Sequence, residues 1–145
     1  MVGRLQIRGA MKTILTLPGL ARLDHDAAAK IFVMHWTSYL GPHFKQGIEA
    51  LLAESRRSGI FAYISNASAA KDVPAQPDFQ WVESHVKPEL LKAGLKRFIT
   101  VVPQSAIAKM GTQRFGKVAA NAGVETYAVA SLDDALDAAR AAKAA

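Results

Sequence analysis

Five polar side chains follow two apolar runs of this sequence at the points where the runs end. The runs, 60–64 and 95–103, have the composition of buried strands. Because ligands settle beyond the carboxyl ends of the strands in parallel α/β sheets, we predict a binding site at this edge. The polar residues of the predicted site are Ser65, Asn66, Ser68, Gln104 and Ser105.

An aromatic and an imidazole side chain from a helical segment complete the predicted site. Trp81 and His85 are four residues apart, so a helix places them on one face. Trp81 would form an apolar wall, with Asn66, Gln104 and His85 as its polar contacts. The alternative is that Trp81 and His85 only cover the edge of the sheet. The predicted helices that begin at this edge have free backbone N–H groups, which suit an anion or a carbonyl.

Catalytic and metal-binding patterns are scarce. The sequence has no Gly-x-Ser-x-Gly, no Walker-type loop and no Gly-x-Gly-x-x-Gly after a strand. It has no cysteine, which excludes disulfides, thiolate metal sites and cysteine nucleophiles. We interpret Asp24-His25-Asp26 as a solvated turn, because the side chains of neighbouring residues diverge. We therefore predict no catalytic residue, no metal site and no cofactor.

Composition limits the class of protein. The chain has 145 residues, half of them apolar, which suits one globular domain. Its net charge of +6 comes from basic residues spread over different segments, so we expect a solvated basic surface and no nucleic-acid partner. No apolar run approaches the roughly 18 residues of a membrane span, and no signal-peptide core is present. The sequence thus favours a cytoplasmic protein without a membrane span.

Local patterns predict the order of strands and helices. Residues 1–11 are predicted to be an extension, with Met1 and Met11 both open as the natural start, and 12–145 a single domain. Pro88 removes a backbone donor inside a helical pattern, so that helix should bend or break near 84–87. Ser131 begins a capping pattern at the last helix. The predicted strands are 12–17, 20–25, 30–36, 60–64, 95–103 and 124–130, and the predicted helices are 42–58, 77–93, 105–122 and 135–142.

Alternating helices and strands build parallel sheets through right-handed crossovers. We predict an α/β fold: a mostly parallel sheet of about five strands with an N-terminal antiparallel hairpin and helices on both faces. In the strand over 95–103, successive side chains should face opposite helical layers with almost no exposure. The two sets are Ile99 and Val101 against Phe98, Thr100 and Val102.

Several stretches of the sequence carry a resemblance to one family. They are Met34-His35-Trp36-Thr37, Asp78-Phe79-Gln80-Trp81, the segment 86–97, Val101-Val102-Pro103 and the segment 131–136. Over 12–142 the chain resembles the SpoIIAA-like fold, which STAS domains share with the lipid-binding Sec14 (CRAL-TRIO) group. It is most similar to free-standing bacterial SpoIIAA-like domains of unassigned role. The resemblance implies a fold, and a fold of this kind hosts several functions.

The resemblance also suggests a phosphorylation site to test. Anti-sigma-factor antagonists of this fold carry a phosphorylated hydroxyl in an Asp-Ser-Ser/Thr-Gly turn after a strand. The corresponding turn here has hydroxyls at Ser65 and Ser68 but lacks both the acidic residue and the glycine, and its loop is longer. We interpret Ser65, Asn66 and Ser68 as residues that hydrogen-bond the loop backbone, and phosphorylation of Ser65 or Ser68 stays open.

Three function classes remain at this point. The STAS-like resemblance favours a non-enzymatic regulatory or protein-interaction module, with a protein partner or self-association. The alternative, by likeness to the Sec14 branch, is a carrier or sensor for a small apolar ligand. An enzyme is the third class, and the scarcity of catalytic patterns argues against it.

Overall fold

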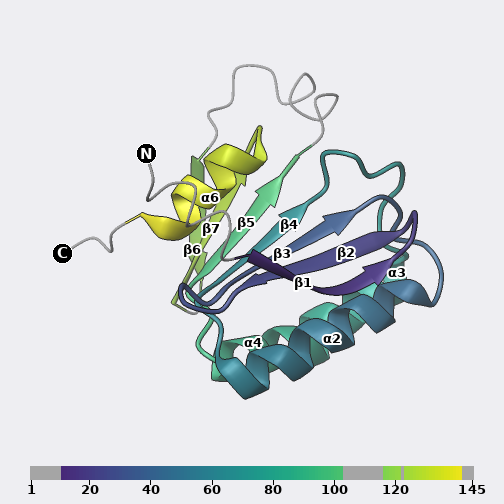
Figure 1. Cartoon of the computed structure of the whole chain (residues 1–145), viewed down its shortest axis with the longest axis horizontal. Coiled ribbons are helices and arrows are strands. Elements are labelled where there is room, and N and C mark those ends of the chain that lie inside the picture. The colour runs from purple at the N-terminus through teal and green to yellow at the C-terminus, as the bar shows by residue number, and fades with distance from the viewer. Residues whose placement is uncertain (1–10, 103–115, 122, 142–145) are drawn as a thin grey trace.

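One mixed sheet organises the chain in the computed structural model, which describes residues 11–102, 116–121 and 123–141 (Figure 1). Seven strands of the described residues lie in the order β1-β2-β3-β4-β5-β7-β6. The strands are β1 (Met11–Leu17), β2 (Ala21–Asp26), β3 (Ile31–Trp36), β4 (Ala62–Asn66), β5 (Arg97–Val101), β6 (Gly116–Asn121) and β7 (Val124–Val129).

The direction of strand pairing changes across the sheet. β1, β2 and β3 pair antiparallel, β3, β4, β5 and β7 pair parallel, and β6 pairs antiparallel with β7. The α/β class and the antiparallel N-terminal hairpin are therefore confirmed. The predicted count of about five mostly parallel strands is corrected to a mixed sheet of seven, since antiparallel strands lie at both edges.

Helices cover both faces of the sheet, as predicted (Figure 1). Pro42 precedes the first of them, and Gly59 at φ 81° ends it. Ser131 caps the last, because its Oγ accepts a 3.1 Å hydrogen bond from the backbone N–H of Asp134. One face, called the α2 face, carries α2 (His43–Ser58), α3 (Gln76–Trp81), η1 (Val82–Val86) and α4 (Lys87–Lys92), and the opposite α6 face carries α6 (Leu132–Arg140).

The strand β5 separates two different environments. Ile99 and Val101 are fully buried on the α6 face, with 0% exposure each. Phe98 and Thr100, which point to the α2 face, are only half-buried. The predicted division of side chains between two layers is confirmed, but the predicted lack of exposure is wrong for the α2 face. The helices on that face do not close over Phe98, which borders a groove.

The predicted helix over 105–122 is replaced by a strand where the structure describes it. Residues 103–115 lie outside the described residues, whereas Gly116–Asn121 form β6. Asn121 pairs with Val124, and Gly123 at φ 81° lies between these two paired residues. The hairpin supplies backbone partners from β7, and this pairing overrides a weak helical periodicity that Gly116 already interrupts.

The segment Asp24-His25-Asp26 lies in β2, which corrects its interpretation as a solvated turn. His25 and Asp26 are both buried. Asp24 and Asp26 point to the α6 face, while His25 stacks on Phe32 on the α2 face with ring centroids 3.9 Å apart. Pairing with β1 and β3, its neighbours along the chain, holds this segment in a strand.

Candidate functional site: an apolar groove beside a π-helical turn

A π-helical turn interrupts the helix that crosses the α2 face. Val82–Val86 form the turn, and the backbone N–H of Lys87 donates to the carbonyl of Val82, five residues earlier. The next residue, Pro88, has no N–H to donate, and its ring would clash with the carbonyl four residues before it in a regular α-helix. The wider turn gives the ring room. The predicted disturbance of the α-helix near 84–87 is confirmed in the form of a π-helical turn, with α-helix on both sides of it.

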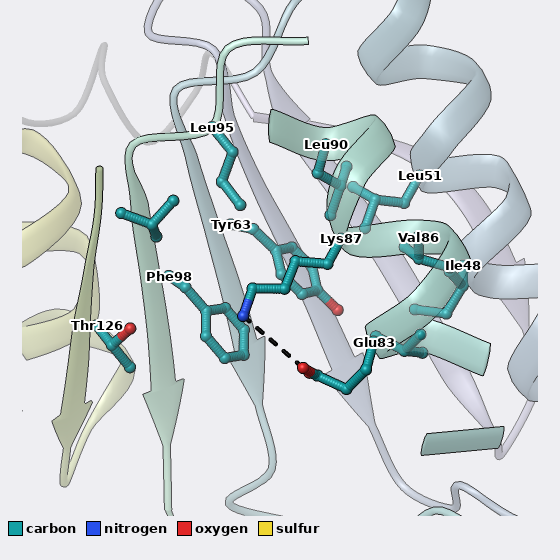
Figure 2. Close-up of a pocket in the computed structure, with 12 residues that line it drawn as sticks. Ile48, Leu51, Tyr63, Glu83, Val86, Lys87, Leu90, Leu95, Phe98 and Thr126 are labelled. Atoms are coloured by element: carbon teal, nitrogen blue, oxygen red, sulfur yellow. Dashed lines mark ion pairs between the residues drawn. The ribbon is translucent and has the colours of Figure 1, made fainter. Parts of the chain in front are cut away.

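The π-helical turn forms one wall of an apolar groove. Val82, Glu83, Val86 and Lys87 line the groove, and their spacing places all four on one side of the helix (Figure 2). Val86 is 1% exposed and anchors this wall against the core. The sequence feature that interrupts the helix therefore also shapes the groove.

The sheet and the remaining helical residues form the floor and the inner wall. Tyr63 of β4 and Phe98 of β5 stack with their ring centroids 5.7 Å apart, and Thr126 of β7 continues the floor (Figure 2). The cavity volume is about 300 Å³. Its inner wall is apolar and comes from Ile48, Leu51, Leu90, Leu95 and Val124.

Few polar groups reach this groove. Lys87 Nζ and Glu83 Oε1 lie 3.7 Å apart, and their side chains are 39% and 50% exposed, so the pair sits at the solvent side. An exposed pair of this kind contributes little to stability and can exchange its partners. Burial, followed by the nearby Tyr39, raises the pKa of Tyr63, so this hydroxyl stays neutral. The groove suits a small, mainly apolar molecule.

The structure divides the residues of the predicted site between both faces of the sheet. Ser65 lies on the α2 face with Tyr63, and its side chain partly opposes the rise in the pKa of Tyr39 and Tyr63 that burial causes. Asn66, its neighbour on β4, points to the α6 face and accepts a 2.7 Å hydrogen bond from Ser68 Oγ. Asn66 and Ser68 are thus brought together, and Ser65 is separated from them.

Trp81 and His85 do not line the groove. Trp81 is half-buried on the α2 face, and Lys45 Nζ lies 5.3 Å from its ring centroid. His85 is exposed, with its Nδ1 2.8 Å from Ser84 Oγ. Gln104 and Ser105 lie outside the described residues. Along this helix, the residues that line the groove start at Val82, one residue after Trp81. The site thus lies beside the π-helical turn and not at Trp81 and His85. Pro88 was the available signal, because it predicted where the helix would change its geometry.

Within 11–102, 116–121 and 123–141, no three side chains of His, Asp or Glu gather as ligands for a metal ion. Among the helices of these residues, none combines the length and the apolar character needed to cross a bilayer.

Comparisons with protein-family models, with curated proteins and with solved structures find no match. The likeness to SpoIIAA-like domains therefore rests on the motifs of the sequence and stays a prediction. Function has to be inferred from the groove and from the polar side chains of this chain.

Proposed function

We propose that this protein binds a small apolar molecule in the groove and acts as its carrier or sensor. The observation that carries the proposal is a cavity of about 300 Å³ whose walls are apolar and whose charged residues, Glu83 and Lys87, stay at the solvent side. Ligand pockets of proteins combine an apolar lining with few polar groups in this way.

The size of the groove limits the ligand. One water occupies about 30 Å³ in the liquid, so about 300 Å³ holds roughly ten groups of that size. Ligands of ten non-hydrogen atoms gain on the order of 0.5 kcal/mol per atom, which corresponds to a Kd on the order of 0.1 mM. A short alkyl or monocyclic compound fits this range.

A filling substitution on the floor of the groove tests the proposal. The probe is 4-(dimethylamino)benzonitrile, a monocyclic fluorophore of this size, displaced by n-alkanols of six, eight and ten carbons. Thr126→Phe places a ring on the groove floor and should weaken probe binding at least tenfold. Thr100→Phe is the matched control, because Thr100 is half-buried on the same face of the sheet but does not line the groove. Binding should change less than twofold in this control.

Two results would contradict the proposal. The first is equal binding of the probe by wild type and Thr126→Phe, with both proteins folded by circular dichroism. The second is a larger effect of Trp81→Ala than of Thr126→Phe, which would move the ligand to the site predicted from the sequence. Displacement that strengthens with alkanol length and then stops at a defined length supports a cavity of fixed size.

The interaction-module function, with a protein partner or self-association, stays a second proposal. Three large apolar side chains of the described residues support it: Leu40, Val73 and Phe79 are 49%, 72% and 51% exposed. Asp72 accepts hydrogen bonds from Ser38 and from the backbone of Tyr39, which holds the segment of Val73 beside that of Leu40. Native mass spectrometry of freshly purified protein separates the two proposals. A co-purified small molecule supports the carrier, and self-association or a captured protein supports the module.

A further inference from the structure

A chain of hydrogen bonds crosses three strands on the α6 face. Asp24 Oδ2 lies 3.1 Å from His35 Nε2, and His35 Nδ1 lies 3.0 Å from Asn66 Nδ2. Asn66 Oδ1 then accepts hydrogen bonds from Ser68, at 3.2 Å from its backbone N–H and 2.7 Å from its Oγ. Both ring nitrogens of His35 are therefore engaged within the protein.

The chemistry of these groups fixes the position of every proton. A backbone N–H only donates, so the atom of Asn66 that faces the amide of Ser68 must be the oxygen. The amide nitrogen of Asn66 therefore donates to His35 Nδ1, which must be unprotonated. The proton of the neutral imidazole lies on Nε2 and is donated to Asp24.

A second ring proton on His35 conflicts with this arrangement. Its Nδ1–H would meet the N–H of Asn66, and two donors would face each other. The amide of Asn66 would have to turn over so that its oxygen accepts from His35. Its nitrogen would then face the backbone N–H of Ser68, and that amide would lose its acceptor. The charged imidazole and the turn closed by Ser68 thus exclude each other.

Charged groups around His35 oppose each other. Asp24 favours the imidazolium, whereas Arg22 disfavours it and pairs with the same carboxylate at 3.1 Å. Thr13 of β1 also donates to Asp24, at 2.8 Å. Burial is the largest cause that lowers the pKa of His35, followed by Arg22. In the structure this balance maintains the neutral ring.

The turn at Ser68 begins the segment that connects β4 to α3. The backbone N–H of Ala67 donates to Val101 at 2.9 Å, and further along Lys71 donates to Thr37 at 3.1 Å. Asp72 holds the far part of the segment through Ser38 and Tyr39. The segment is thus attached near Ser68, where Asn66 contacts His35, and again around Asp72, where the carbonyl of its partner Ser38 contacts His43 Nε2 at 2.7 Å.

We propose that His35 and Asn66 form a proton-sensitive latch: uptake of a second ring proton by His35 turns over the Asn66 amide and releases the turn at Ser68. The part of the segment after Lys71 stays attached through Asp72. The latch is a conformational device of its own and does not depend on the groove or its ligand.

Nuclear magnetic resonance of the whole chain between pH 8 and pH 4.5 tests the latch. Ring nitrogen shifts follow the tautomer and protonation of His35, and hydrogen exchange gives the protection of single amides. The protection factor of Ser68 should fall at least tenfold in step with protonation of His35, while that of Lys71 stays constant. Protection of Ser68 that does not change while His35 titrates would overturn the proposal.

Two variants separate the latch from general loosening in acid. Asn66→Asp supplies a carboxylate that can accept from both His35 and Ser68, so the pKa of His35 should rise and Ser68 should stay protected throughout. Arg22→Gln removes an exposed opposing charge, so protonation of His35 and release of Ser68 should move together to higher pH. If Asn66→Asp fails to fold, Arg22→Gln alone still tests whether release of Ser68 follows protonation of His35. Movement of the His35 titration without movement of the Ser68 release would overturn the latch.

Discussion

Small residues close the α6 face of the sheet, whereas an irregular helix leaves the α2 face partly open. On the α6 face, Ala135 and Ala139 pack directly on the sheet and are 0% and 1% exposed. On the α2 face, the helix that contains the π-helical turn packs through Val86 and Leu90 but leaves the groove above Phe98. Alanines let a helix approach a sheet closely, and a widened turn with larger side chains prevents that approach.

This difference suggests that the two faces have separate tasks. The α6 face packs closely on the central strands. The hydrogen bonds that link Asp24, His35 and Asn66 lie on the same face. The α2 face contains the apolar groove. Substitutions on the two faces should therefore have different effects on stability, and these effects can be measured in pairs that share one strand.

The largest expected effect belongs to Ile99, at the closed face of β5. Ile99→Ala removes a side chain with 0% exposure and should lower the free energy of unfolding by about 2–5 kcal/mol. Phe98→Ala, one residue earlier and beside the groove, should lower it by only about 1–2 kcal/mol, since part of the ring already lacks packing partners.

Urea denaturation followed by circular dichroism measures both losses. A loss of less than about 1 kcal/mol for Ile99→Ala would mean that the closed face does not dominate stability. A larger loss for Phe98→Ala than for Ile99→Ala would reverse the comparison.

The second effect concerns how α6 is held on its face. Arg97 is 4% exposed, and its Nη1 donates to the carbonyls of Ala138 and Ala141 at 3.0 and 2.6 Å. A positive charge at the last carbonyls of a helix is favourable. Arg97→Met keeps the apolar stem but loses these bonds, and it should lower the free energy of unfolding by about 2 kcal/mol.

Lys96→Met is the matched control for Arg97→Met, because it removes the same charge from the neighbouring, exposed residue. It should change stability by less than about 0.5 kcal/mol. Equal losses in both variants, measured by urea denaturation, would show that net charge matters and that the contact with α6 does not. If neither variant loses stability, the packing of Ala135 and Ala139 is sufficient to hold α6 on the sheet.

Local signals predicted most element boundaries of the described chain. Gly94 is an example: it directly follows the predicted helix over 77–93, it has φ 116°, and a Cβ there would lie 2.9 Å from the carbonyl oxygen of Ile60. Pro88 likewise predicted an interrupted helix. Such residues act through their own backbone, so a single sequence reveals them.

Features that depend on how strands and helices meet in space were missed. β6 forms because β7 supplies its partners, and local periodicity favoured a helix instead. His35 meets Asn66 only because β3 pairs with β4 in that register. The groove was displaced from the predicted site for a related reason, since its shape depends on which helical side chains face Tyr63 and Phe98. The contact of His35 with Asn66 and the shape of the groove join segments that are far apart in the sequence, whereas the β6-β7 hairpin is local.

The smallest expected effect compares the two histidines of the opposite faces. His25 is buried on the α2 face, and among the described residues its Nε2 has no hydrogen-bond partner. His35 has partners on both ring nitrogens on the α6 face. Burial is the main cause that lowers the pKa of both below the ordinary 6.5.

The sign of the pH effect follows from these directions. Below about pH 6.5 the unfolded chain binds more protons at His25 and His35 than the folded chain does. Stability should therefore be greatest above pH 6.5 and fall as the pH drops from 6.5 through the folded pKa values. The pKa of Glu54 is lowered, chiefly by its hydrogen bond with Arg57, so this carboxylate stays ionised over that window.

Replacing His25 separates the contributions of the two faces. His25→Phe keeps a ring stacked on Phe32 and removes both the titration and the unpaired nitrogen, so its stability should depend less on pH than that of the wild type. Urea denaturation at pH 7.5, 6.5 and 5.5 measures this slope. The slope that remains in His25→Phe should come from His35 and decrease further in Arg22→Gln, where the opposing charge is absent. An unchanged slope in His25→Phe would mean that the packed α2 face admits a charged imidazole, and the contrast between the two histidines would then be lost.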